Sequence, residues 1–113
     1  MLKKRVERKI QRFPAQLALR ELNGQPAGGA HLVDISSVGA QVETPRVFPM
    51  NAPLEFVVHF PGMNGDARLS GLTRWIKPII GRPGWFRLGL KFFQPYWEID
   101  HLARKGILGG DGP

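Results

Sequence analysis

The sequence predicts an all-β fold, a small antiparallel barrel with one C-terminal α-helix. Fourteen glycines and ten prolines divide the 113 residues into short segments. Within most of these segments apolar and polar residues alternate, as expected of strands that bury one face. The exception follows Pro95, where apolar residues recur at helical spacing. A chain of this length is enough for one domain with one hydrophobic core.

Six segments are expected to form the strands: residues 13–22, 30–36, 39–44, 54–60, 67–76 and 85–93. The pair Asn23-Gly24 predicts a tight turn inside the loop 23–29. Residues 44–53 form a proline-rich connection, and Gly71 is expected to mark a bulge.

Residues 96–108 are expected to form an amphipathic helix that covers one open end of the barrel and buries Trp97 or Ile99. The domain prediction is a flexible basic arm at residues 1–12, a single barrel domain with its helix at 13–108, and a flexible tail at 109–113.

Positive charge is concentrated at the N-terminus. The formal net charge is +7, and residues 1–12 hold six basic side chains against Glu7, or +5. The remaining residues carry ten basic and eight acidic side chains, or +2. Such an arm attracts phosphates. A solvated tail that aids solubility is the other interpretation.

The chain has no cysteine, which excludes disulfides, thiolate metal ligands and cysteine nucleophiles. No run approaches the roughly 20 apolar residues of a membrane helix, and no apolar stretch of a secretory signal follows the basic N-terminus. We therefore expect a cytoplasmic protein with no membrane-inserted segment.

Catalytic and metal-binding constellations are absent from the sequence. His31, His59 and His101 lie on separate elements, without the spacing of a metal site. There is no nucleophile elbow and no Gly-rich phosphate loop followed by Lys and Ser or Thr. We expect a protein that is not an enzyme and that has no cofactor and no metal.

Two short motifs are candidates for a binding site. The stretch LVDISSVGAQVE, residues 32–43, places Asp34, Ser36 and Gly39 between two predicted strands. A turn explains all three, since Asp and Ser accept backbone hydrogen bonds and Gly permits a positive φ. Arg8 and Arg12 form the second motif, an R-x-x-x-R pair just before the first strand. Either motif alone is weakly to moderately specific, and the combination is stronger.

With these two motifs the sequence resembles the PilZ domain family, whose signatures are R-x-x-x-R in an N-terminal loop and D/N-x-S-x-x-G on the barrel. The segments GLTRWI and RLGLKFF are similar to its later strands, so the resemblance covers about residues 5–108. It implies a six-stranded antiparallel barrel and a bacterial receptor for cyclic di-GMP.

The resemblance implies the following ligand-binding residues: Arg8, Arg12, Asp34, Ser36, Gly39 and Trp75. An arginine fork matches guanine O6 and N7, and its plane can stack on the base. Asp34 and Ser36 would accept hydrogen bonds from guanine or orient an arginine. Trp75 either stacks on a guanine or packs in the fold. Trp85 and Trp97 are expected to pack.

The layout also suggests a mechanism. The ligand would clamp the charged arm onto the barrel, and the new surface would engage a downstream protein. Two alternatives remain at this point. One is a protein-interaction adaptor of motility or pilus machinery that does not use the nucleotide. The other, less favoured, is a small nucleic-acid-binding barrel, since the aromatic residues occupy alternating, buried positions rather than an exposed face.

Overall fold

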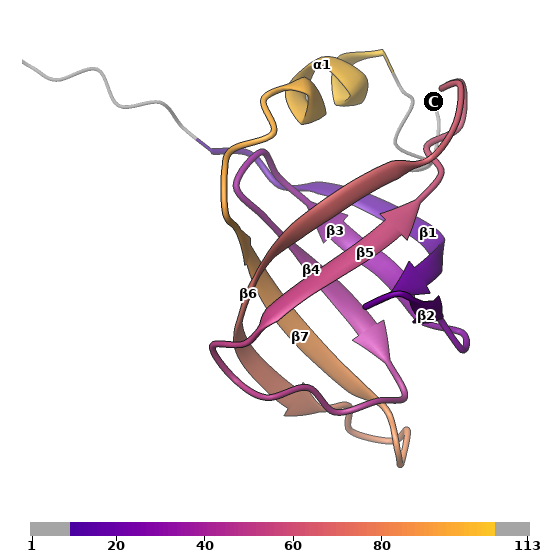
Figure 1. Cartoon of the computed structure of the whole chain (residues 1–113), viewed down its shortest axis with the longest axis vertical. Helices are drawn as coiled ribbons and strands as arrows, with labels where there is room; N and C mark the ends of the chain where they lie inside the picture. Colours follow the sequence, from indigo (N-terminus) through magenta and orange to yellow (C-terminus); the bar gives the residue numbers. More distant parts are fainter. Residues whose placement is uncertain (1–9, 106–113) are drawn as a thin grey trace, which may run out of the picture.

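The computed structural model describes residues 10–105, which form a closed barrel with one short helix at its upper end (Figure 1). The elements in chain order are β1 (Phe13–Leu22), β2 (Gln25–Pro26), β3 (His31–Ile35), β4 (Gly39–Thr44), β5 (Pro53–Val58), β6 (Ala67–Pro78), β7 (Phe86–Phe92) and α1 (Glu98–Arg104). The sheet order is β2-β1-β3-β4-β7-β6-β5, and a further pairing of β1 with β5 closes the sheet.

All these pairings are antiparallel. The predicted all-β class and six-stranded antiparallel barrel with a C-terminal helix are therefore confirmed. The additional strand β2 was predicted as loop, and it pairs only with the end of β1. The turn that joins them is the expected one, because Asn23 and Gly24 have φ values of 54° and 77°. Two consecutive positive φ angles are what a tight hairpin turn of this kind requires.

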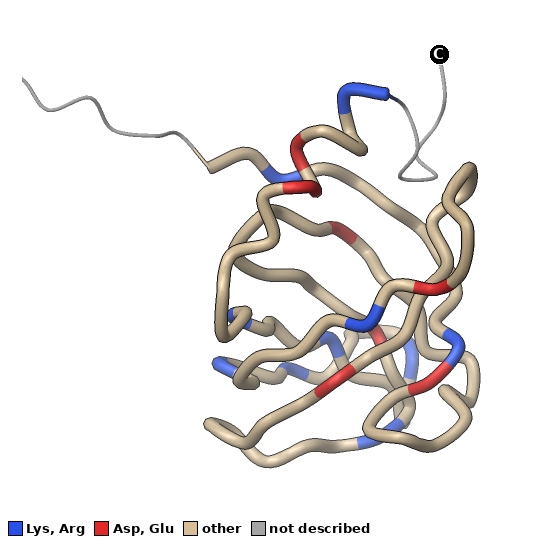
Figure 2. Tube along the Cα trace, turned by 45° about the horizontal axis from the view of Figure 1, so that its top comes forward, with Lys and Arg blue, Asp and Glu red and all other residues tan. Residues whose placement is uncertain are grey.

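The core fills the inside of the barrel. The four alternating residues of 54–60 are all buried, as the pattern predicted: Leu54, Phe56, Val58 and Phe60. From the opposite strands the core receives Leu32, Val42 and Leu88, each completely buried. Charged residues occur along the strands and in the loops (Figure 2), and among those described only Glu43 is buried. No helix within residues 10–105 is long and apolar enough to cross a bilayer.

Helix α1 covers one end of the barrel and is shorter than predicted. It begins at Glu98 rather than at residue 96. The Tyr96 amide donates to the Ser37 carbonyl at 2.7 Å, which ties the segment before the helix to the β3–β4 turn. Of the two residues that the helix was expected to bury, Ile99 is the buried one, and Trp97 is 47% exposed. The Tyr96 ring meets Phe92 edge to face, with centroids 4.9 Å apart. The expected helical residues 106–108 lie outside the described residues.

The bulge predicted at Gly71 lies further along the same strand. Pairing of β6 with β7 is regular through Gly71, and its register shifts between Thr73 and Trp75. Gly71 is required for a different reason: a Cβ there would lie 2.1 Å from the Lys91 carbonyl oxygen. The glycine therefore allows β6 and β7 to approach closely.

Phe56→Ala should lower the free energy of unfolding by about 3–5 kcal/mol, because it leaves a cavity in a filled core. Urea denaturation of both proteins measures this difference. Val47→Ala, at an exposed position, is the matched control and should change stability by less than about 0.5 kcal/mol. Equal losses in the two variants would contradict this account of the core.

Candidate functional site

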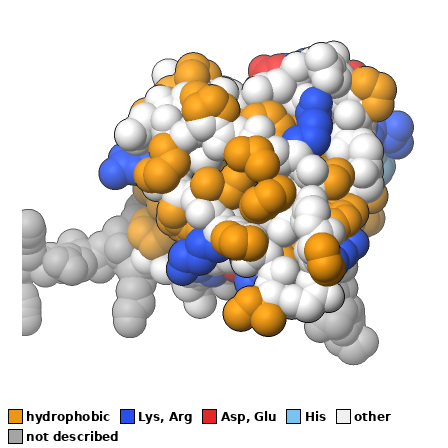
Figure 3. Space-filling model, turned by 90° about the horizontal axis from the view of Figure 1, so that it is seen from below, with side chains coloured by type: hydrophobic (Ala, Val, Ile, Leu, Met, Phe, Trp, Pro, Cys, Tyr) orange, Lys and Arg blue, Asp and Glu red, His pale blue; other side chains and the backbone are white. Residues whose placement is uncertain are grey.

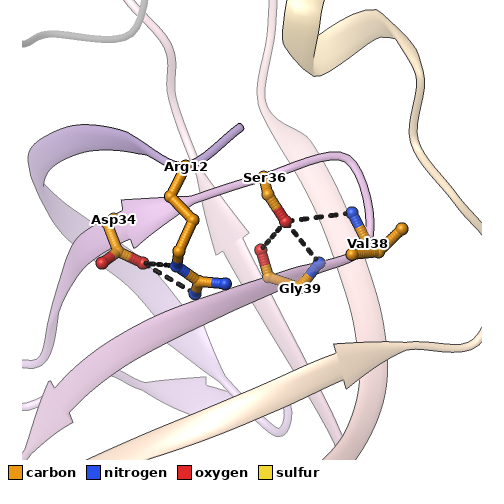
Figure 4. A network of polar contacts seen from close by, with 5 residues as sticks. All are labelled: Arg12, Asp34, Ser36, Val38 and Gly39. Atoms are coloured by element: carbon orange, nitrogen blue, oxygen red, sulfur yellow. Dashed lines mark hydrogen bonds and ion pairs between the residues drawn. The ribbon is translucent and has the colours of Figure 1, made fainter. Parts of the chain in front are cut away.

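The turn between β3 and β4 is organised by Ser36. Its hydroxyl accepts hydrogen bonds from the amides of Val38 and Gly39 at 3.2 and 3.1 Å (Figure 4). The same hydroxyl lies 3.3 Å from the Gly39 carbonyl oxygen, which also accepts from the Ser36 amide at 2.8 Å. Ser36 is completely buried. It therefore shapes the turn from inside and does not face solvent.

Gly39 was expected to supply a positive φ, and this was wrong: the residues with positive φ do not include it. The structure gives a steric reason for the glycine. A Cβ at this position would lie 2.4 Å from the Leu90 carbonyl oxygen of β7. The absence of a side chain lets the start of β4 pair with β7, where Gly39 lies opposite Lys91.

Arg12 and Asp34 form the polar contact next to this turn. Nε and one terminal nitrogen of Arg12 both donate to Asp34 Oδ1, at 3.2 and 2.8 Å. The pair is partly open to solvent. Figure 4 shows the Arg12 guanidinium pointing toward the Asp34 carboxylate. Its position follows from the sheet, since β1 begins at Phe13 opposite Ile35 and so delivers Arg12 beside Asp34. Arg8, the other arginine of the motif, lies outside the described residues.

Four strands bring Asp34 and Trp75 into one row across the outer wall of the barrel. Asp34 of β3 is the register partner of Gln41 in β4, Gln41 is the partner of Gly89 in β7, and Gly89 is the partner of Trp75 in β6. Direct cross-strand partners project from the same face of a sheet. The row covers three inter-strand gaps, or about 14 Å at the usual strand spacing.

Gly89 is the reason that the Trp75 indole lies close to this wall. A Cβ on Gly89 would lie 2.2 Å from the indole Nε1 and 2.3 Å from Cε2. The ring therefore occupies the space that any other residue at 89 would fill. Lys77 Nζ lies 5.3 Å from the centre of the same ring, within the range of a cation–π contact.

Two shallow hollows meet at Gln41 and Trp75, which line both of them. The first has a volume of about 250 Å³ and is also lined by Arg12, Arg74 and Lys91. The second has a volume of about 470 Å³ and is also lined by Lys77 and Arg87. Together they reach the size range of small-molecule sites, roughly 300–1,000 Å³. Among the described residues that line them, five are basic and none is acidic, so these hollows favour an anionic ligand.

The structure thus brings Arg12, Asp34 and Trp75 to one surface and places Ser36 and Gly39 behind it. Sequence reasoning missed Gln41 and Gly89, which join the two ends of the row. Signals for both were present. Gln41 occupies an outward-facing position of a strand that starts at Gly39. Gly89 is a glycine inside the alternating segment 85–93, and such a glycine indicates close approach of another group.

A second charged cluster lies around Glu43 of β4. Arg87 donates to the Glu43 carboxylate, with its Nε at 2.9 Å from Oε2, while His31 Nε2 and Arg82 lie 3.1 and 3.6 Å from Oε1. Burial of the carboxyl raises the pKa of Glu43, but the hydrogen bonds and charge of Arg87, with the charges of His31 and Arg82, outweigh it. The net pKa of Glu43 lies below its ordinary value of 4.5.

Trp85 packs beside this cluster, as expected. The Arg82 guanidinium lies 3.7 Å from the centre of its ring, and the ring edge approaches Gly29. Within residues 10–105, no three His, Asp or Glu side chains gather in a way that could hold a metal ion.

Comparison with known proteins agrees with this architecture. The PilZ domain family model matches residues 6–104, which is nearly the whole chain. The chain belongs to the PilZ domain family. PilZ domains are binding and adaptor domains, and cyclic di-GMP is their general ligand. The search of curated proteins found no match.

Glu43→Gln should reduce the dependence of stability on acid pH. Because the pKa of Glu43 is lower in the folded state, its carboxylate stabilises the fold fully above the ordinary value of 4.5. This contribution disappears as pH falls through the folded-state pKa. Urea unfolding at neutral and acid pH measures it: the wild type should lose more stability than the variant on acidification. If both proteins lost the same unfolding free energy on acidification, the Glu43 carboxylate would not contribute to the pH dependence of stability.

Proposed function

We propose that this PilZ domain is a receptor for cyclic di-GMP that binds the dinucleotide along the row from Asp34 to Trp75. The observation that carries the proposal is the row itself. It joins an arginine–carboxylate pair at one end to an indole at the other, across a basic surface. The ligand has two guanines and two phosphates, and this wall offers groups suited to each.

Arg12 is the candidate for reading a guanine. Asp34 accepts from two nitrogens of Arg12 and so fixes the plane of its guanidinium in advance. A guanidinium held in one plane can pair with guanine O6 and N7 or stack on the base, at a lower entropic cost than a free side chain. Asp34 is then an orienting group as well as an acceptor for a guanine N–H.

Trp75 is the candidate for stacking on the other guanine. Aromatic stacking is worth about 1–3 kcal/mol per base. Lys77, Arg74 and Lys91 border the indole in the two hollows and provide positive charge for the phosphates. Ser36 and Gly39 act through the backbone: the first fixes the turn and the second allows β4 to pack beside β7.

Arg8 would complete the site from the N-terminal arm. Arg12 is already on the barrel, four residues after Arg8, so a short length of chain separates Arg8 from the first hollow. Ligand contacts from Arg8 would order the arm on the outer wall and create a surface for a downstream protein. The domain would bind its ligand without catalysing any reaction of it.

Arg12→Ala, Asp34→Ala and Trp75→Ala should each weaken cyclic di-GMP binding by about 10- to 100-fold, since each removes a charge-assisted hydrogen bond or a stacking contact. Calorimetric titration measures the affinity and the stoichiometry. Arg68→Ala is the matched control, because Arg68 is a basic β6 residue whose guanidinium pairs with Glu55 instead. It should bind like the wild type. No saturable binding by the wild-type chain would refute the receptor function and favour the nucleotide-independent adaptor.

Cyclic di-GMP should slow amide hydrogen exchange in residues 1–12 of the wild type, because arm contacts to the ligand would protect these amides. Arg8→Ala is expected to remove this protection while retaining the protection around Trp75. Mass spectrometry of exchanged peptides resolves the two regions. Protection confined to the barrel in the wild type would contradict ordering of the arm.

A further inference from the structure

The end of the barrel opposite α1 has an apolar centre. It is formed by the β4–β5 connection, residues 45–52, and by the β6–β7 hairpin, residues 79–85, because Thr44, Phe86 and Pro78 are neighbours in register. Three large hydrophobic side chains project from these loops: Val47, Met50 and Ile80 are 65%, 54% and 98% exposed. Figure 3 shows hydrophobic side chains gathered across this face, with basic ones around them.

Backbone hydrogen bonds hold both loops in shape. In the hairpin the Ile79 amide donates to the Trp85 carbonyl at 3.0 Å, and the Arg82 amide donates to the Ile79 carbonyl at 3.2 Å. In the connection the Asn51 amide donates to the Thr73 carbonyl at 2.6 Å. The exposed side chains are therefore presented on fixed supports, which lowers the entropy lost on binding.

The two segments that form this end carry basic side chains and no acidic ones. Residues 44–53 contain one basic side chain and residues 74–91 contain five, and neither segment contains an acidic one. Glu43, the nearest acid in sequence, is bonded to Arg87 and lies 3.6 Å from Arg82. The α1 end is different, because Glu98 and Asp100 there accompany Arg104. Figure 2 shows Lys and Arg along the lower part of the barrel, with some Asp and Glu between them.

We propose that this end, the surface of residues 45–52 and 79–85 with its basic border, docks on an anionic phospholipid membrane. Ile80 projects far from the surface, so insertion into the apolar part of a bilayer would bury most of its side chain. Lys77 and Arg82 beside it would meet the anionic headgroups. A second copy of the chain is a poor occupant, because two such faces would oppose like charges. The contact is peripheral, at headgroup depth, and no segment spans the bilayer.

Sedimentation with phospholipid vesicles tests the proposal on the full chain without nucleotide. The wild type should bind vesicles of equal phosphatidylcholine and phosphatidylglycerol, and it should not bind phosphatidylcholine alone. Added salt should weaken the binding. The double variant Val47→Ser, Ile80→Ser should lower the partition coefficient by about tenfold or more, since two apolar contacts are lost without a change in charge.

Phe93→Ser is the matched control for the loss of an exposed hydrophobic side chain. Phe93 is 55% exposed and follows β7 at the α1 end, away from the proposed face. This variant should bind vesicles like the wild type. All three proteins should melt at similar temperatures, because the altered side chains are exposed.

A second measurement reports the insertion directly. The chain has no cysteine, so Ile80→Cys and Phe93→Cys each provide a single site for an environment-sensitive dye. Anionic vesicles should shift the emission of the Ile80→Cys conjugate to the blue and leave that of Phe93→Cys unchanged.

Two results would overturn the proposal. Equal vesicle binding by the wild type and the double variant would mean adsorption by the basic arm alone. No binding to anionic vesicles would exclude the membrane and make an acidic protein surface the better occupant. The docking surface adjoins the proposed ligand site, because Lys77 and Ile80 line the second hollow. Calorimetric titration of cyclic di-GMP into the same variants therefore tests the receptor function separately from the membrane contact.

Discussion

The hydrogen-bonded pairing of β1 with β5 closes the sheet, and the rest of the structure depends on this closure. A closed antiparallel barrel has no free edge of the main sheet and divides each strand into an inner and an outer face. Apolar residues such as Phe56, Leu32 and Leu88 can then fill a single interior. The register that closure enforces also decides which outward side chains become neighbours.

That register produces the candidate site from positions far apart in the sequence. Asp34 and Trp75 come together only because β4 and β7 lie between them and contribute Gln41 and Gly89. Three glycines, at 39, 71 and 89, lie where a Cβ would clash with a neighbouring carbonyl or with the indole. These close approaches keep the wall compact, so the polar groups along it are held by strands and not by mobile loops.

The outer surface has two basic regions with different chemistry. On the side wall, Arg74, Lys77 and Lys91 surround an indole and shallow hollows, which suits a compact anion with planar bases. At the end opposite α1, basic residues surround projecting aliphatic side chains, which suits an extended anionic surface. Arg87 connects the two regions, because it lines the second hollow and also neutralises Glu43. A ligand on the wall and a surface at the end would therefore share part of one electrostatic environment.

The sequence by itself determined the fold class, the six main strands, the Asn23-Gly24 turn and the two motifs, because these depend on alternation and on local backbone chemistry. It also marked Arg12, Asp34 and Trp75, which the barrel brings to one wall. Only the tertiary structure decided why glycine stands at positions 39 and 71, since the local pattern does not show which neighbouring strand approaches each of them. It likewise decided that Ser36 faces inward, that Trp97 stays exposed and that Gln41 completes the row. The reason is that periodicity gives the two faces of a strand, whereas strand order and register decide which residues meet across them.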